Sequence, residues 1–308
     1  MTHTRAVLLM VFVAFMWSTA GVVTRHLDAA RSFEVAFWRS SFMLLSLAIT
    51  MTIMRGAAFW RSFRTLPRTV WISGIYWSIM FTSFMVAITL TAVANVLVTM
   101  ALNPLITALF ARIFLRHKLP LRTWVAIIVA GLGIAWMFSN QLSSGISVTG
   151  TLVALLVPLA TAMNFTTLQY ANHHERASAK TPAPDMVPAL LIGGTLSALG
   201  TFPLAYPLQA SAHDLGLLAL LGSLQLTLPC LLLIHLSQRL PAPEIALLGL
   251  LEVILGVTWT WLGAGEQPSN STLIGGGLVL GALLVNEWLA LRSRQAVEAE
   301  EFPPPPTC

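Results

Sequence analysis

The chain has 308 residues, of which 56% are hydrophobic and only 9% are charged, with a formal net charge of +5 and a mean hydropathy of +0.78. In soluble domains about 25% of residues are charged, so this composition excludes an ordinary water-soluble enzyme or binding module. We therefore predict an all-α integral membrane protein.

Apolar runs of the length needed to span a membrane follow one another along the whole chain. A transmembrane helix requires ~20 largely apolar residues to cross ~30 Å of hydrocarbon. The connections between the runs are short, which leaves no room for a soluble domain, and the fifth run is the shortest. We predict ten transmembrane helices, over 5–24, 33–53, 70–90, 93–113, 122–139, 149–170, 186–206, 214–236, 243–262 and 271–291.

The basic residues are distributed unequally between the two sides that these helices define. Of the 17 Lys and Arg residues, only Arg25 and Arg31 fall on one side, and Arg39 lies inside the second helix. Short loops rich in Lys and Arg stay in the cytoplasm, so both termini are predicted to be cytoplasmic. The pI of 9.9 follows from this topology and requires no nucleic-acid partner. The remaining cations share the other side: Arg5, Arg55, Arg61, Arg64, Arg68, Arg112, Arg116, Lys118, Arg122, Arg176, Lys180, Arg239, Arg292 and Arg294.

The two halves of the chain resemble each other. When Glu252 is placed over Asn103, Glu266 falls over His117 with the same offset, and glycines follow in both copies. Because five helices is an odd number, the second copy would enter the membrane from the opposite face, as in many secondary transporters. The alternative is that any two apolar helix–loop–helix units align this well. We predict two inverted five-helix repeats, 1–145 and 146–294, and a disordered cytoplasmic tail, 295–308.

Several short motifs, taken in order, resemble the EamA-type repeat of the drug/metabolite transporter superfamily. They are Trp17-Ser18, Arg39, Asn103-Pro104, Glu252-Val253, Gly265-Glu266 and the stretch Gly275–Gly281. The sequence departs from the family at Arg116-His117-Lys118, where a Glu followed by a base is usual, and at Val253, where a Pro is common. The resemblance implies a ten-helix secondary transporter of the bacterial cytoplasmic (inner) membrane that moves small metabolites, amino acids or drugs, often outward.

Glu252 lies near the middle of the predicted ninth helix. An ionised carboxylate at that depth costs at least ~2.5 kcal/mol unless it faces a cavity or a partner. As a functional group it would bind a cationic substrate or carry the coupling proton. As a structural group it would hydrogen-bond to neighbouring helices, a task that an amide performs at lower cost.

Arg39 lies about six residues inside the second helix, roughly 9 Å deep at 1.5 Å per residue. Its long side chain could reach the membrane surface, pair with Glu34, or hold a substrate carboxylate. Together, Arg39 and Glu252 would offer the two charges that bind an amino-acid zwitterion.

Five amides are predicted at mid-membrane depth, and we include them among the candidate substrate-binding residues. Hydrogen bonding between helices is their alternative role. Pro104 removes one backbone hydrogen bond from the fourth helix and is the candidate hinge, although kinked helices are common in membranes. The amides are Asn95, Asn103, Asn164, Gln169 and Gln225.

Three tryptophans, Trp17, Trp77 and Trp259, lie deeper than the interfacial ones and are candidate ligands for an aromatic or cationic substrate. They could equally face lipid.

The leading hypothesis is a secondary transporter that exports a small metabolite, such as an amino acid or an aromatic or cationic compound, by alternating access. Import of such a metabolite, or a channel, is the alternative. An enzyme is not expected, because the zincin and serine-hydrolase motifs are absent, and neither is nucleotide binding, because no P-loop is present. We expect no cofactor and no metal, since His173, His174 and Glu175 lack further ligands. The expected partners are a small-molecule substrate and the lipid bilayer, with the chain a monomer or a homodimer.

Overall fold

The computed structural model describes residues 3–114, 119–143, 148–177, 185–236, 239–240 and 242–301, with side chains left out at 138–143, 168–177, 242–244, 246–247, 291 and 293–301. Every regular element in these ranges is helical, and no strand occurs among them. The helices are α1 (His3–Thr24), α2 (Ser32–Ser62), η1 (Phe63–Thr65), α3 (Arg68–Leu90), α4 (Val93–Met100), α5 (Asn103–Phe114), α6 (Leu121–Ser143), α7 (Thr149–Ala177), α8 (Val187–Ala205), α9 (Ala212–Leu220), the π-helix η2 (Leu221–Thr227), α10 (Leu228–Leu236), α11 (Ala242–Ala264) and α12 (Asn270–Glu301).

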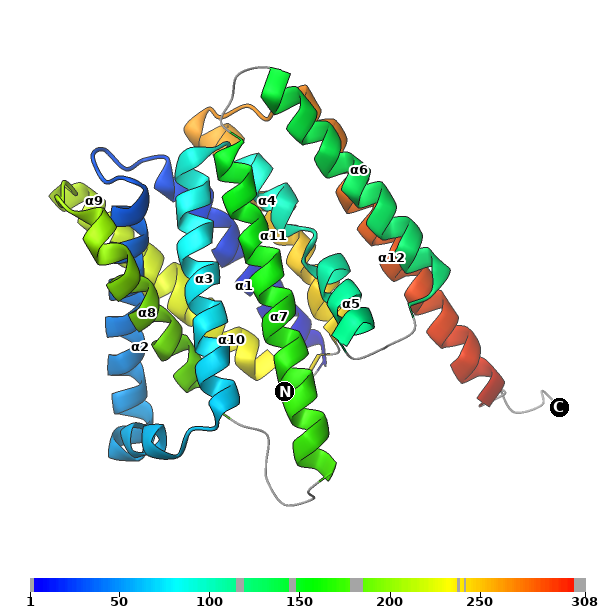
Figure 1. Ribbon diagram of the computed structural model, residues 1–308, viewed down its shortest axis with the longest axis horizontal. Helices are drawn as coiled ribbons and strands as arrows, with labels where there is room; N and C mark the ends of the chain where they lie inside the picture. Colours follow the sequence, from blue (N-terminus) through cyan, green and yellow to red (C-terminus); the bar gives the residue numbers. More distant parts are fainter. Residues whose placement is uncertain are drawn as a thin grey trace.

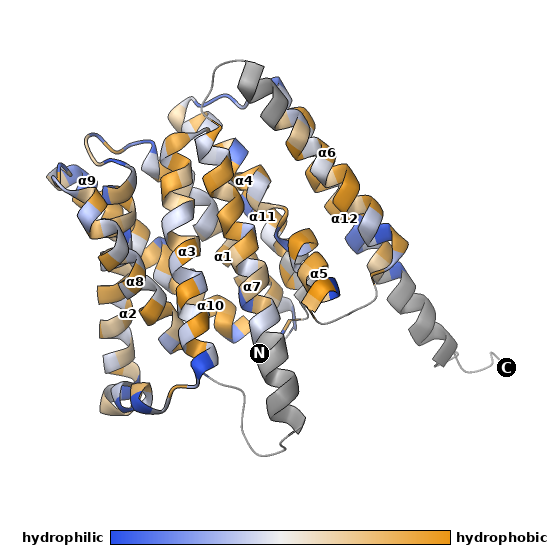
Figure 2. Cartoon of the chain, viewed as in Figure 1, coloured by the Kyte–Doolittle hydropathy of each residue, from blue (hydrophilic) through white to orange (hydrophobic). Residues whose placement is uncertain are grey.

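The apolar helices have the composition of membrane spans. Within the described ranges, eight helical segments are long and apolar enough to cross a bilayer, and Leu121–Met137 and Leu248–Ala264 are shorter apolar helices. Figure 2 shows hydrophobic residues along the helices and hydrophilic ones concentrated in the loops and at helix ends. The multi-pass, all-α architecture is therefore supported, whereas the count of ten spans and the orientation of the termini stay predictions.

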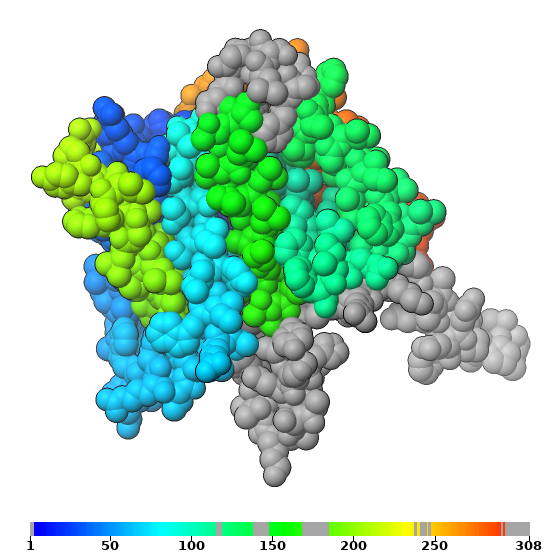
Figure 3. Space-filling view, in the orientation of Figure 1, coloured from blue at the N-terminus to red at the C-terminus, as the bar shows by residue number. Residues whose placement is uncertain are grey.

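The helices form a bundle with one pair at its side. Helix α3 packs against α7 and α8, α2 packs against α8, and α1 packs against α11. Helices α6 and α12 pack along each other, and Figure 1 shows this pair tilted at the edge of the bundle. The space-filling view shows α3 and α7 side by side across the front face, with α6 at its edge (Figure 3). Among the described residues, the buried charged side chains, Glu34, Arg39 and Asp214, lie in the bundle away from the α6–α12 pair.

Helix α2 changes direction at Gly56. Its φ of 58° lies in the left-handed region, which glycine adopts without the steric cost that a Cβ adds. The apolar run expected over 33–53 ends just before this bend. The residues beyond it curl back at the lower end of the bundle in Figure 1.

Two spans are interrupted near their middle. Helix α4 ends at Met100 and α5 begins at Asn103, so the helix is interrupted shortly before Pro104. The missing backbone N–H of this proline predicts such an interruption. Between α9 and α10 the helix widens into η2, which precedes Pro229. Pro229 has no N–H for the carbonyl of Gln225, so one α-helical hydrogen bond is missing where the π-helix ends. By contrast, α7 continues past Pro158 without a break.

The C-terminal helix is longer than expected. Helix α12 continues to Glu301, so residues 295–301, which we expected to be disordered, are helical. The rest of the expected tail, 302–308, lies outside the described residues.

Asp214 fastens the loop between α1 and α2 to the start of α9. Its carboxylate is fully buried and accepts hydrogen bonds from the backbone N–H groups of Asp28, Ala29 and Ala30 at 2.7–3.0 Å. It also accepts one from Ser211 N–H, within a capping box at the start of α9. Buried backbone N–H groups need acceptors, and the one carboxylate of Asp214 accepts hydrogen bonds from four of these groups.

Replacing Asp214 with Asn should destabilise the protein by ~1–3 kcal/mol, because an amide puts N–H groups against backbone donors and removes the charge. Thermal unfolding in detergent measures the effect. Asp28→Asn is the matched control, since its contact with His213 is more than half exposed and contributes little. Equal unfolding temperatures for the two variants would contradict the role given to Asp214.

Candidate functional site

Arg39 is a charged side chain buried deep between helices. It projects from α2 and is 3% exposed. Its Nη2 donates to Gln225 Oε1 at 2.9 Å, and its guanidinium carbon lies 5.7 Å from the centre of the Phe84 ring on α3. Its Nε is buried with no hydrogen-bond partner. The guanidinium is thus held in place while part of its hydrogen-bonding capacity stays unused.

Glu34 does not pair with Arg39. Its carboxylate accepts hydrogen bonds from the backbone N–H groups of Gln209 and Ala210, each at 2.8 Å, and from the Trp38 indole. It therefore ties α2 to the loop before α9, and this contact answers one of the alternatives left open by the sequence.

Glu252 lies on α11 within electrostatic range of Arg39 and of Cys230 on α10. The side chain is half-buried. Among the described residues, no hydrogen bond or ion pair engages its carboxylate. Arg39 and Glu252 thus lie within electrostatic range of each other in the membrane interior without forming an ion pair, which is a costly arrangement.

Gln225 occupies the π-helix η2 and is 1% exposed. Its Oε1 accepts from Arg39, and its Nε2 donates to the carbonyl of Trp17 at 3.0 Å. This one amide therefore links α2, η2 and α1. The sequence places Gln225 among candidate substrate ligands, and the structure shows that both ends of its side chain already have partners.

The other predicted amides fall into two groups. Asn103, at the start of α5, and Asn164, on α7, each have a buried side-chain oxygen with no partner. Asn95, on α4, donates to Thr91 Oγ1 at 3.2 Å and accepts from Thr272 Oγ1 at 2.6 Å, so it joins α4 to α12. The Gln169 side chain lies outside the described residues.

The three deep tryptophans lie at different contacts. Trp17 is half-buried between α1, α2 and α10. Trp77 packs with Phe81 and against α8 at Gly193. Trp259 donates from Nε1 to Ser18 Oγ at 3.2 Å, across the α1–α11 contact. Only Trp17 is bonded, through its backbone, to the Arg39–Gln225 pair.

Phe84 and Cys230 belong to this region but were not among the predicted site residues. Phe84 reads as one more apolar residue of the third span, and Cys230 as a buried cysteine. Nothing in the local pattern signals that Phe84 lies beside Arg39 or that Cys230 is within electrostatic range of it, because both depend on how α2, α3 and α10 pack.

One end of the bundle, at the top in Figure 1, is fastened by contacts between distant parts of the chain; we call residues 25–31, 89–95, 206–214 and 260–272 the closed end. Arg25 Nε pairs with Glu266 Oε2 at 2.5 Å, and Arg25 Nη2 donates to the Thr91 carbonyl at 2.7 Å. Glu266 Oε1 also accepts from Val93 N–H at 2.6 Å. These contacts hold the end of α1, the α3–α4 junction and the end of α11 together.

Below the closed end, small residues let α1, α4 and α11 approach closely. A Cβ on Gly21 would lie 2.4 Å from Val93 Cγ1, and one on Gly256 would lie 2.5 Å from Leu97 Cδ1. Almost all of α4 is buried, whereas α5, across the helix break, is mostly half-buried and packs against α7 and α6. The described helices are therefore packed more closely on the α4 side of the break.

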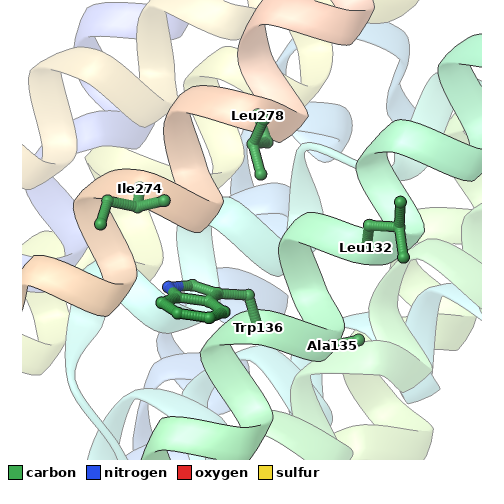
Figure 4. Close-up of a pocket in the computed structure, with 5 residues that line it drawn as sticks. All are labelled: Leu132, Ala135, Trp136, Ile274 and Leu278. Atoms are coloured by element: carbon green, nitrogen blue, oxygen red, sulfur yellow. The ribbon is translucent and has the colours of Figure 1, made fainter.

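Two other features of the surface do not form the site. Figure 4 shows an apolar groove between α6 and α12, lined by Leu132, Ala135, Trp136, Ile274 and Leu278, without a charged group to recognise a solute. Among the described residues, Asp28, His213 and Asp214 form the one group with metal-ligand spacing. The Asp214 oxygens already accept four backbone hydrogen bonds, which accounts for their position without a metal.

The chain is similar in sequence and in fold to known proteins. Residues 4–139 match the EamA-like transporter family. This part of the chain is thus similar to the EamA-like transporters, the family that the motifs of the sequence resemble. It is also 22% identical to the pseudopaline exporter CntI from two strains of Pseudomonas aeruginosa, over 90% of this chain and 94% of the exporter. A crystal structure of a protein at 18% identity superposes with a TM-score of 0.63, over 94% of this chain and 99% of the other, which is a likeness of fold.

The Arg25–Glu266 contact can be tested by a double-mutant cycle. Arg25→Gln and Glu266→Gln should each lower the unfolding temperature, and the double variant should cost less than the sum of the two. We expect a coupling free energy of about 1 kcal/mol, since the pair is only partly shielded from solvent. Thermal unfolding in detergent provides the readout, with Arg31→Gln as the exposed control. Strictly additive effects would show that the two side chains do not interact.

Proposed function

We propose that the chain is a secondary transporter that exports a small charged metabolite across the bacterial inner membrane by alternating access. The transporter family and the full-length similarity to an exporter support the class of activity. The substrate region is the one around Arg39, Gln225 and Glu252, and Glu252 carries the coupling proton.

The observation that carries this proposal is the unpaired state of Arg39 and Glu252. They project from α2 and α11, in the first and second halves of the chain, and are electrostatic neighbours. Removing a charge from water is costly unless it is paired. A metabolite with both charges would pair with the two side chains and with both halves at once.

The packing of the helices supports the two inverted repeats, 1–145 and 146–294. If the first five spans exchange places with the last five, the contact of α3 with α7 maps onto that of α1 with α10. The contact of α1 with α11 maps onto that of α7 with α4 and α5, and the α2–α8 and α6–α12 contacts map onto themselves. Such symmetry is what places a substrate site between two repeats.

We infer that the closed end faces away from the cytoplasm, because the basic loops lie at the opposite ends of the spans. Alternating access then requires the Arg25–Glu266 contact to break during the cycle. The helix break before Pro104 is the proposed hinge, since it separates the buried α4 from the less buried α5.

Solute counterflow in proteoliposomes tests the function, with a panel of amino acids and organic cations and Glu252→Gln beside the wild type. We expect at least one solute to exchange in both proteins. The variant should fail to concentrate that solute on an imposed proton gradient, so that its accumulation ratio falls to about one, because an amide cannot carry a proton.

Asp28→Asn, at the exposed surface of the closed end, is the control and should accumulate the solute as the wild type does. Equal accumulation by wild type and Glu252→Gln would show that Glu252 does not carry the coupling proton. Uptake into cells that depends on the protein would favour import, single-channel currents would favour a channel, and no exchange of any solute would overturn the transporter proposal.

A disulfide that joins α1 to α11 next to the closed end should stop transport. Val22 on α1 and Gly263 on α11 approach so closely that a Cβ at 263 would lie 2.7 Å from Val22 Cγ2. The double variant Val22→Cys/Gly263→Cys should therefore form a disulfide under oxidation. We expect exchange to be lost in the oxidised protein and restored by dithiothreitol, whereas each single variant should be insensitive to both. Full exchange with the disulfide formed would show that this end does not open.

A further inference from the structure

Arg39 has hydrogen-bond donors to spare at a depth where spare donors are costly. A guanidinium carries five N–H donors in one plane. Among the described residues, Gln225 is the one hydrogen-bond partner of this group, and Nε is buried without any. Nearly all buried polar groups in native proteins are satisfied, so unused donors on a buried guanidinium are the feature expected of a ligand-binding group.

Gln225 fixes the guanidinium rather than competing for it. Its amide orientation is set by its partners, because a flipped amide would put NH₂ against the Arg39 donors and oxygen against the Trp17 carbonyl. Since both ends of the side chain are used, Gln225 is not free to bind a solute. The Phe84 ring supports the guanidinium from a second helix.

The shape of the unused part of Arg39 indicates what it binds. Gln225 uses Nη2, so the unused donors include Nε and extend around the remaining edge of the plane. The planar fork of arginine matches a carboxylate, which can accept two parallel hydrogen bonds. Glu252 is close enough to interact electrostatically but is not bonded to this edge, so it does not serve as the internal carboxylate.

We propose that Arg39 is the carboxylate subsite of the transporter, that Gln225 is the positioning residue that directs its free donors to the substrate, and that the substrate is therefore a carboxylate-bearing metabolite. The statement that the bound molecule is a transported substrate rests on the proposed function. The statement that Arg39 binds a carboxylate rests on the geometry of Arg39 alone. Among the charged metabolites considered above, this proposal favours those that carry a carboxylate and disfavours cations that have none.

Binding to the purified protein in detergent tests the proposal without requiring transport. The probes are matched pairs that differ by one carboxylate: L-leucine and 3-methylbutylamine, L-phenylalanine and 2-phenylethylamine, L-histidine and histamine, and L-lysine and 1,5-diaminopentane. For at least one pair, we expect the amino acid to bind ten-fold or more tightly than the amine, as about 10- to 100-fold follows from losing a hydrogen-bonded charge pair. Equal affinities in every pair, or no binding of any amino acid, would overturn the proposal.

Variants separate the two roles. Arg39→Gln should abolish the preference, so that amino acid and amine bind with similar affinity. Gln225→Leu should weaken the amino acid about ten-fold and leave the amine unchanged, because it removes the support of Arg39 and not a substrate contact. Gln209→Leu, an exposed glutamine in the α8–α9 loop, is the matched control and should leave the preference intact.

Two further measurements distinguish a specific loss of amino-acid binding from misfolding of the variant. Gln225→Glu keeps an acceptor for Arg39 and adds a competing negative charge, so it should fold and should weaken amino-acid binding more than Gln225→Leu does. In counterflow, Gln225→Leu should raise KM with little change in the maximal rate, which a general loss of structure would not do. An Arg39→Gln protein that keeps its preference for the amino acid would show that the carboxylate binds elsewhere. Failure of transport with the binding preference intact would instead count against the proposed function alone.

Discussion

The structure depends on buried or half-buried carboxylates that accept hydrogen bonds from backbone N–H groups where helices end. Three such side chains lie at or next to the closed end. Asp214 accepts the amides of the α1–α2 loop, Glu34 accepts those of the α8–α9 loop, and Glu266 accepts that of Val93. Backbone donors that are shielded from water need acceptors, so each carboxylate fixes one contact between distant parts of the chain. Because each bond joins residues far apart in the sequence, the three together determine how the first spans sit against the last.

The apolar runs predicted most of the helical segments, since the bilayer imposes a length on each. The expected spans 70–90 and 93–113 correspond to Arg68–Leu90 and to Val93–Phe114, and the break before Pro104 follows from local chemistry. The π-helix η2 was not predicted, because a proline signals that the regular pattern stops but not which alternative replaces it. The continuation of α12 to Glu301 was not predicted either, because its polar end has no apolar run to mark it.

The candidate site was only partly accessible from the sequence. A charge at membrane depth is visible in any hydropathy pattern, so Arg39 and Glu252 could be named from the chain alone. Which partner each one has could not, since that depends on packing between helices. Glu34 is five residues from Arg39 and looks like its partner, yet it bonds to the backbone at 209 and 210, and Gln225 bonds to Arg39 in its place.

Buried polar groups need partners, and this requirement distinguishes the proposed substrate region from the closed end. Asp214, Glu34 and Glu266 are engaged by backbone donors or by arginine, and an acidic group with such partners is accounted for by the fold. Glu252 has no such partner among the described residues, and Arg39, within electrostatic range of it, keeps unused donors. Pairing a buried charge recovers part of its desolvation cost, so an arginine with unused donors and a neighbouring glutamate without a bonded partner are not accounted for by the fold alone. We propose that a metabolite with both charges binds to these two side chains, and in a transporter such a molecule would also give the two halves a reason to move together.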